Sequence, residues 1–187
     1  MVAKFKKDSV MKLLLSLALL LPLCLLAQEP ETATALPAPT CNATEYRQFD
    51  FWIGEWTVTS GDQPAGTNSI QKIHGGCALQ ENWQGEGAGG ISGTSFNIYD
   101  QATGNWHQTW VDSSGTLLQL DGGLSDGAMV LSGQRPARDG NGRVLHKISW
   151  TPNPDGTVSQ LWEASTDRGQ SWKVLFDGLY TRDSSAL

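Results

Sequence analysis

The sequence is poor in the residues on which several classes of function depend. Its 187 residues include only 3 His, 3 Cys and 13 Lys plus Arg, against 19 Asp plus Glu, for a net charge of -6. Nucleic-acid binding rests on clustered Lys and Arg, so this balance argues against nucleic acid as a partner. The three His are scattered without the short spacing of a zinc site, and we expect no metal centre and no cofactor. At roughly 100 to 200 residues per domain, the length allows one folded domain.

The sequence also lacks an apolar run long enough to cross a membrane as a helix. The longest run covers residues 13–26, which is 14 residues, whereas a membrane-spanning helix needs roughly 20. Four lysines between residues 4 and 12 precede the run and Ala27 follows it, a pattern typical of a secretory signal peptide over residues 1–27. We therefore expect a periplasmic or secreted protein with no stable membrane insertion after cleavage.

Two alternatives stay open within this segment. Met11, followed by Lys12 and the Leu-rich run, forms a complete signal peptide by itself and is a second candidate start. Cys24 is a candidate for lipid attachment, although Leu23 stands where such a signal has a small residue. Removal of residues 1–27 takes away four basic residues and one acidic residue, which changes the net charge from -6 to -9.

Cys41 and Cys77 lie outside the predicted signal peptide. Two cysteines in an oxidising compartment are more often a disulfide than a reactive pair, so we predict a Cys41–Cys77 bond. It would close a loop of about 35 residues and stabilise the fold by about 3–4 kcal/mol in the chain-entropy model. Two buried free thiols are the alternative.

The chain divides by composition into a tether, a domain and a short tail. Residues 28–45 combine three prolines with Glu, Thr and Ala, which predicts a flexible tether. Residues 46–182 show short β-type runs separated by Gly, Asp and Pro clusters, and residues 183–187 follow as a tail. This pattern, with hairpin turns such as Asn153–Gly156, predicts an all-β fold, a single antiparallel meander β-barrel of about ten strands. Tyr46–Trp52 is predicted as a short N-terminal helical turn that closes one end.

The predicted strands cover residues 55–60, 67–73, 78–84, 93–99, 105–111, 116–121, 128–134, 143–151, 157–165 and 172–181. The segment Ser165–Trp172 resembles the Asp-box of sialidase propellers, with Ser171 at the Thr position. A propeller needs this motif once per blade, and the chain has it once, so we interpret it as a structural turn.

Alternation along these strands assigns an inward face, because successive side chains of a strand point to opposite sides. The inward sets are Leu79, Glu81 and Trp83; Trp106, Gln108 and Trp110; Val144, His146, Ile148 and Trp150; Val158, Gln160 and Trp162; and Trp172, Val174 and Phe176. Buried polar side chains without partners cost about 1–3 kcal/mol each. The inward Glu, Gln and His must therefore bond one another, water or a ligand.

Flat apolar Trp surface with a few orienting polar groups is the usual make-up of a small-molecule pocket. The leading hypothesis is a non-enzymatic carrier or sensor that binds a small apolar or aromatic molecule. The candidate ligand-binding residues are Glu81, Trp83, Gln108, Trp110, His146, Trp150, Gln160 and Trp162. One alternative is a structural or interaction domain of the cell envelope with a filled core. Another is an enzyme that uses Glu81 and His146 as acid and base, for which no nucleophile, metal or oxyanion motif is found.

Gly54-Glu55-Trp56 resembles the G-x-W motif of lipocalin-like (calycin) barrels. The resemblance implies that Trp56 closes one end of the barrel and that Arg182, from the last strand, packs on it. Longer motifs resemble a family of exported bacterial domains of unknown function over residues 46–182, namely Phe49–Trp56, Gly76–Trp83, Tyr99–Trp106, Trp110–Asp112 and Phe176–Tyr180. This second resemblance implies a calycin-like barrel and brings no established activity.

Nitrobindin-like haem barrels are a more distant resemblance. Their opening motif continues with glycines that Thr57–Ser60 do not supply. Their haem-ligating His comes from near the C-terminal end, whereas the last His of this sequence is His146. These departures argue against haem binding.

Overall fold

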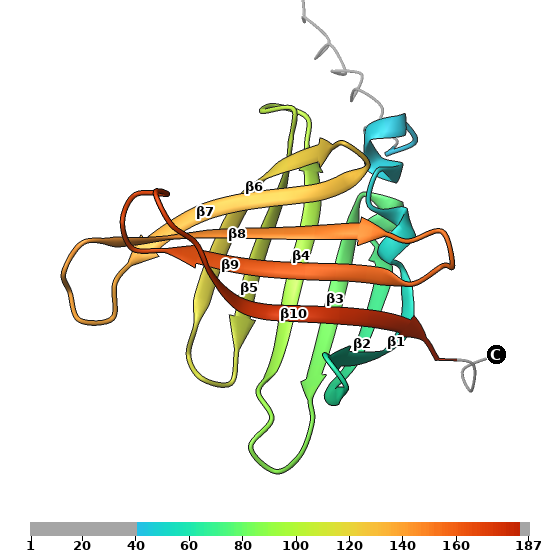
Figure 1. The fold of residues 1–187 in the computed structure, drawn as a ribbon. Coiled ribbons are helices and arrows are strands. Elements are labelled where there is room, and N and C mark those ends of the chain that lie inside the picture. Colours follow the sequence, from blue (N-terminus) through green and yellow to red (C-terminus); the bar gives the residue numbers. More distant parts are fainter. Residues whose placement is uncertain (1–40, 184–187) are drawn as a thin grey trace, which may run out of the picture. The chain divides into compact units, whose positions relative to one another are not determined.

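The computed structural model describes residues 41–183, which form one closed barrel of ten antiparallel strands. Each strand pairs with the next along the chain, and β1 closes the barrel against β10 (Figure 1). In this last pair Trp56 lies opposite Arg182. The strands are β1 (Gly54–Ser60), β2 (Gln63–Ile73), β3 (Ala78–Gly85), β4 (Ser92–Asp100), β5 (Asn105–Asp112), β6 (Leu117–Ser125), β7 (Ala128–Pro136), β8 (Arg143–Pro152), β9 (Val158–Ser165) and β10 (Lys173–Arg182). The predicted all-β meander is therefore confirmed. The predicted signal peptide, residues 28–40 of the tether and residues 184–187 lie outside the described residues.

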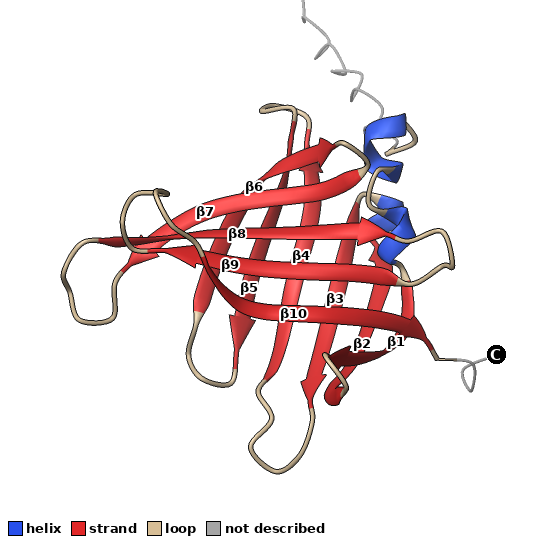
Figure 2. Cartoon of the chain, viewed as in Figure 1, coloured by secondary structure: helices blue, strands red, loops and turns tan. Residues whose placement is uncertain are grey.

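Two short 3-10 turns close one end of the barrel. They are η1 (Thr44–Arg47) and η2 (Asp50–Trp52), and they lie together at one end of the strands (Figure 2). Phe49 and Trp52 are fully buried and stack with ring centroids 4.8 Å apart. Phe49 also meets Trp106 and Trp150 edge-on. We call Phe49 and Trp52 the plug, because burial of these rings seals this end against water.

Trp56 lies directly beside the plug. Its indole Nε1 donates to the Trp52 carbonyl at 2.9 Å. The Arg182 guanidinium sits over its ring, 4.4 Å from the centroid, and donates to the Ile53 carbonyl at 3.0 Å. Trp56 and Arg182 are thus in contact at this end, as the lipocalin-like motif implied.

A disulfide joins Cys41 to Cys77, as predicted, with 5.0 Å between their Cα atoms. It connects the segment before η1 to the turn η3 (His74–Gly76), which links β2 and β3. Arg47 strengthens the same connection, because its guanidinium donates to the carbonyls of Cys41 and Gly76 at 3.1 and 2.6 Å. The bond therefore fixes the N-terminal turns to the barrel, and residues 41–45 of the predicted tether belong to this ordered connection.

One strand face differs from the prediction. The alternation pattern placed Trp172, Val174 and Phe176 on one inward face, but Trp172 and Val174 are 36% and 52% exposed. The register of β10 against β9 shifts between Val174 and Phe176, and such a bulge reverses the side on which the preceding residues point. Trp172 lies instead on the outside, with the Lys147 ammonium 4.6 Å above its ring.

The turn before β10 folds around Asp167. Its carboxylate accepts hydrogen bonds from the Ser165 hydroxyl at 2.7 Å and from the backbone and hydroxyl of Ser171 at 2.9 and 2.5 Å. Hydrogen bonds from Ser171, above all, lower the pKa of Asp167 to about 2. The Asp-box-like segment is thus a self-contained turn. Among residues 41–183, no helix has the length and hydropathy of a membrane-spanning segment.

Candidate functional site

A cavity of about 360 Å³ lies inside the barrel. At its inner end are Trp150, which contacts the plug, and Tyr180, which faces Trp52 and Trp56. At its outer end it reaches the loops that connect β3 to β4, β5 to β6 and β7 to β8, through Ile91, Ser114 and Arg138. Because consecutive strands are antiparallel, these loops lie at the end opposite the plug. The barrel is therefore closed at one end and open among loops at the other.

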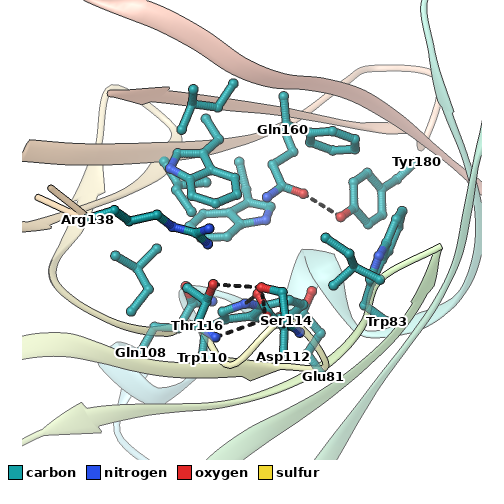
Figure 3. A pocket seen from close by; sticks show the side chains of 17 residues that line it. Glu81, Trp83, Gln108, Trp110, Asp112, Ser114, Thr116, Arg138, Gln160 and Tyr180 are labelled. Carbon is teal, nitrogen blue, oxygen red and sulfur yellow. Dashed lines mark hydrogen bonds between the residues drawn. The ribbon is translucent and has the colours of Figure 1, made fainter. Parts of the chain in front are cut away.

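Aromatic and aliphatic side chains form most of the cavity wall (Figure 3). They are Trp83, Trp110, Trp150, Trp162, Phe176 and Tyr180, with Ile91, Leu118, Ile148 and Leu175. Such a wall offers flat apolar surface to a ligand and little hydrogen bonding.

Glycines in the strands make room for three of these rings. A Cβ atom at Gly93 of β4 would overlap the Trp110 indole, and one at Gly178 of β10 would overlap the Phe176 ring. A Cβ atom at Gly66 of β2 would come within 2.9 Å of the Trp83 ring. Each ring therefore occupies the space that a side chain at the glycine position would fill. This arrangement keeps the rings against the wall and the lumen open.

The inner part of the cavity holds a buried polar network centred on Glu81. The two oxygens of its carboxylate accept hydrogen bonds from Asn68 Nδ2 at 2.7 Å and from the Ser95 hydroxyl at 2.6 Å. Ser95 in turn accepts from Asn97 Nδ2 at 2.9 Å, and Gln108 Nε2 donates to Asn97 Oδ1 at 2.9 Å. The inward polar residues of β2, β3, β4 and β5 are thus hydrogen-bonded to one another across neighbouring strands, although the buried Asn68 Oδ1 has no partner among the described residues.

A second arm of the network comes from the other side of the barrel. The Tyr180 hydroxyl donates a short hydrogen bond to Gln160 Oε1 (Figure 3). The same hydroxyl lies 3.4 Å from Asn68 Nδ2, which donates to it. Burial, with the nearby Glu81 carboxylate, raises the pKa of Tyr180 well above its ordinary value. Tyr180 is therefore a neutral donor at physiological pH.

Burial also dominates the electrostatics of Glu81. It raises the pKa of the carboxyl to about 7, against the lowering effect of the hydrogen bonds from Ser95 and Asn68. A carboxyl with this pKa changes charge near neutral pH, so its protonation state is sensitive to any charge that enters the cavity.

Charged side chains stand at the open end. Arg138, exposed on the β7–β8 loop, turns its guanidinium toward the cavity (Figure 3). Asp112, at the end of β5, accepts from Trp110 Nε1 at 3.1 Å and from the Ser114 hydroxyl at 2.6 Å. Partial burial alone would raise the pKa of Asp112, but hydrogen bonds from Ser114, Trp110 and the Thr116 backbone lower it. The rim therefore carries one charge of each sign.

The structure brings seven of the eight candidate ligand-binding residues to this cavity. They are Glu81, Trp83, Gln108, Trp110, Trp150, Gln160 and Trp162. His146 is buried but is not among the lining residues. Its Nδ1 accepts a hydrogen bond from Trp162 Nε1 at 3.1 Å, and burial, with the charge of Arg135, lowers the pKa of its ring. No hydrogen bond within the described residues joins His146 to Glu81.

Sequence reasoning missed several members of the site. Asn68, Ser95 and Asn97 are buried on inward faces. Asn68 could have been predicted, because alternation places it on the same face of its strand as the apolar Ile70. The inward face of β4 is harder to predict because its polar residues point inward and its apolar residues point outward. Phe96 and Ile98 are 50% and 40% exposed, while Ser95 and Asn97 are buried. The rim residues lie in or beside loops, where no periodicity exists to assign a direction.

A different polar group lies on the outer surface of β5 and β6. His107 Nδ1 lies 2.7 Å from Asp121 Oδ1, and its Nε2 lies 2.8 Å from the Thr109 hydroxyl. A carboxylate, an imidazole and a hydroxyl in this order also make up the catalytic triad of hydrolases. A triad needs free backbone N–H groups nearby to bind the oxyanion, whereas the N–H groups of β5 are used in pairing with β4 and β6. We therefore interpret the group as a surface hydrogen-bond row.

Within residues 41–183, no group of three or more His, Cys, Asp or Glu side chains is placed to hold a metal ion. The chain matches no protein-family model, and no curated protein is significantly similar to it in sequence.

Proposed function

We propose that this protein is a non-enzymatic binding protein that holds a small apolar or aromatic molecule in the lumen of its barrel. The observation that carries the proposal is the cavity of about 360 Å³. Small-molecule sites are typically concave, about 300–1,000 Å³ in volume, largely apolar and equipped with a few convergent polar groups. This cavity has that make-up, with aromatic walls and with Glu81, Gln108 and Gln160 at its polar part.

The filled-core alternative has less support. A structural domain would be expected to fill its barrel with side chains, because interiors are close-packed and voids forfeit dispersion contacts. Here Gly66, Gly93 and Gly178 leave room for rings along the wall, and no side chain of the described residues fills the centre. The acid–base alternative also has less support, since His146 bonds Trp162 and does not line the cavity.

We also propose that the protein acts in an oxidising compartment, periplasmic or extracellular. The Cys41–Cys77 disulfide supports this, because such bonds persist in secreted proteins and are rare in a reducing cytosol. The contact between Trp56 and Arg182 supports the further proposal that the barrel is lipocalin-like.

The binding proposal is tested with fluoroindole, a neutral aromatic probe whose fluorine NMR signal is not obscured by protein resonances. We expect saturable binding of one molecule per chain, because the lumen is a single cavity. Gly93→Ala, whose new methyl group would push the Trp110 indole off the wall, should weaken binding about tenfold or more. Gly123→Ala on β6 is the matched control, because a Cβ atom there meets no atom within 4 Å.

Two results would overturn the proposal. One is the absence of saturable binding by the wild-type protein. The other is equal binding by the Gly93→Ala and Gly123→Ala variants, because the probe would then occupy a surface other than the lumen.

A further inference from the structure

The polar part of the cavity is arranged around one carboxylate. Both oxygens of Glu81 accept hydrogen bonds, from Asn68 at 2.7 Å and from Ser95 at 2.6 Å. The Ser95 oxygen itself accepts from Asn97 at 2.9 Å, so the Ser95 proton is directed to Glu81. Gln108 donates in turn to Asn97 at 2.9 Å. Every donor in the chain from Gln108 onward points toward Glu81, which is the pattern that stabilises an ionised carboxylate.

This carboxylate lacks a counter-charge. Among the described residues no Lys, Arg or His forms an ion pair with Glu81, and the ion pairs that do occur involve Asp50, Asp121 and Glu163. Glu81 is only 5% exposed. A buried ionised group that is hydrogen-bonded but unpaired is costly, and burial accordingly raises the pKa of Glu81 to about 7.

The other groups around Glu81 do not supply the missing charge. Asn68 on β2, Ser95 on β4 and Gln160 on β9 are neutral, and the pKa of Tyr180 on β10 is raised by burial, so its hydroxyl stays protonated. Asp112 and Arg138 are the other ionisable side chains that line the cavity; both lie at the rim, with opposite charges. A cation that pairs with Glu81 would therefore come from a bound molecule and not from the described residues.

The rest of the lumen suits a cation with an apolar body. The faces of Trp and Phe rings attract cations, and Trp83, Trp110, Trp162 and Phe176 line the same cavity as Glu81. Gln108 donates through Nε2, and its Oε1 accepts no hydrogen bond from the described residues, so this oxygen is available to an N–H donor. An ammonium group has three donors to share between such oxygens.

We propose that the lumen selects molecules with a protonated amine at one end of an aromatic or aliphatic body, the ammonium group meeting Glu81 and the body lying against the Trp walls. This inference rests on the proposed binding function and names the chemical class of the ligand. Recognition of the ammonium group also explains a donor network that ends on an unpaired carboxylate.

Three probes of similar size and different charge test the inference by isothermal titration calorimetry: phenylethylamine, phenylethanol and phenylpropionate. We expect the amine to bind at least about tenfold more tightly than the alcohol at about pH 8, and the carboxylate to bind most weakly. Glu81→Gln should remove the preference for the amine, so that the amine and the alcohol bind this variant with similar affinity. Glu55→Gln, which removes an exposed carboxylate from β1, is the matched control for net charge.

The pH dependence provides a second readout that needs no variant. The amine remains protonated below about pH 9, whereas Glu81 with a pKa of about 7 gains a proton as the pH falls. Amine affinity should therefore fall about 30-fold between about pH 8 and pH 5.5, while alcohol affinity changes little.

Each outcome separates this inference from the binding proposal. Binding of phenylethanol without tighter binding of phenylethylamine would overturn amine selection and leave the lumen as a binding site. A preference for the amine that survives Glu81→Gln would overturn the assignment to Glu81. Failure of all three probes to bind at millimolar concentrations would overturn both proposals.

Discussion

The buried carboxyl of Glu81 makes a specific prediction about stability and pH. Its pKa is about 7 in the folded protein, against 4.5 for an ordinary glutamate. Between these values the folded state binds more protons than the unfolded state, so the free energy of unfolding falls as the pH rises. One pKa unit corresponds to 1.36 kcal/mol, and the difference therefore amounts to about 3 kcal/mol. This stabilisation is fully present below about pH 4.5 and is lost as the pH rises through 7.

Glu81→Gln should remove this dependence. A Gln side chain can accept from Ser95 through its oxygen. Asn68 now donates to the other carboxylate oxygen through Nδ2, so its amide must turn over to let its unpartnered Oδ1 accept from the Gln nitrogen. The variant should match the wild type within about 1 kcal/mol at about pH 4, and exceed its unfolding free energy by about 3 kcal/mol at about pH 8.

The assay is urea unfolding of the ligand-free, disulfide-bonded protein at a series of pH values, followed by circular dichroism. Other carboxyl groups titrate in both proteins, so the difference between wild type and Glu81→Gln isolates this residue. Glu55→Gln serves as the control and should follow the wild-type curve. A constant difference between wild type and Glu81→Gln from about pH 4 to pH 8 would refute the reasoning.

Two further predictions concern the closed end of the barrel. Replacement of both Cys41 and Cys77 by Ser should lower the free energy of unfolding by about 3–4 kcal/mol, because it removes a bond between residues 36 positions apart. Urea unfolding measures this loss, and a midpoint equal to that of the wild type would contradict the prediction. Phe49→Ala empties the centre of the plug, where Phe49 is fully buried against Trp52, and should cost about 3–5 kcal/mol. Thermal unfolding measures that loss, and a melting temperature equal to that of the wild type would show that the plug contributes little.

Much of the fold could be predicted because it rests on a regular pattern. Short β-type runs separated by Gly, Asp and Pro clusters predicted all ten strands, and alternation with period two correctly placed Glu81, Gln108 and Gln160 on inward faces. It failed at Trp172 and Val174, because a single bulge changes the parity of a strand and leaves no mark in the sequence.

The site itself was harder to predict than the fold. The inward polar residues Ser95 and Asn97 are stabilised by partners on neighbouring strands, and only the register reveals those partners. The volume of the cavity depends on where the rings lie relative to glycines such as Gly93. This is a property of three-dimensional packing and cannot be predicted from composition. Arg138 reaches the cavity from a loop, where direction follows from the turn and not from periodicity.

The position of the bound molecule is the most direct test of the binding proposal, and the eight tryptophans of the chain can report it. Proton–nitrogen NMR of the indole N–H groups, recorded while fluoroindole is added, distinguishes the lumen from the rest of the barrel. We predict that the signals of Trp83, Trp110 and Trp162 shift, whereas that of Trp172 on the outer surface does not. Shifts at Trp172 without shifts at the lumen tryptophans, or no shifts at saturating probe, would contradict the account.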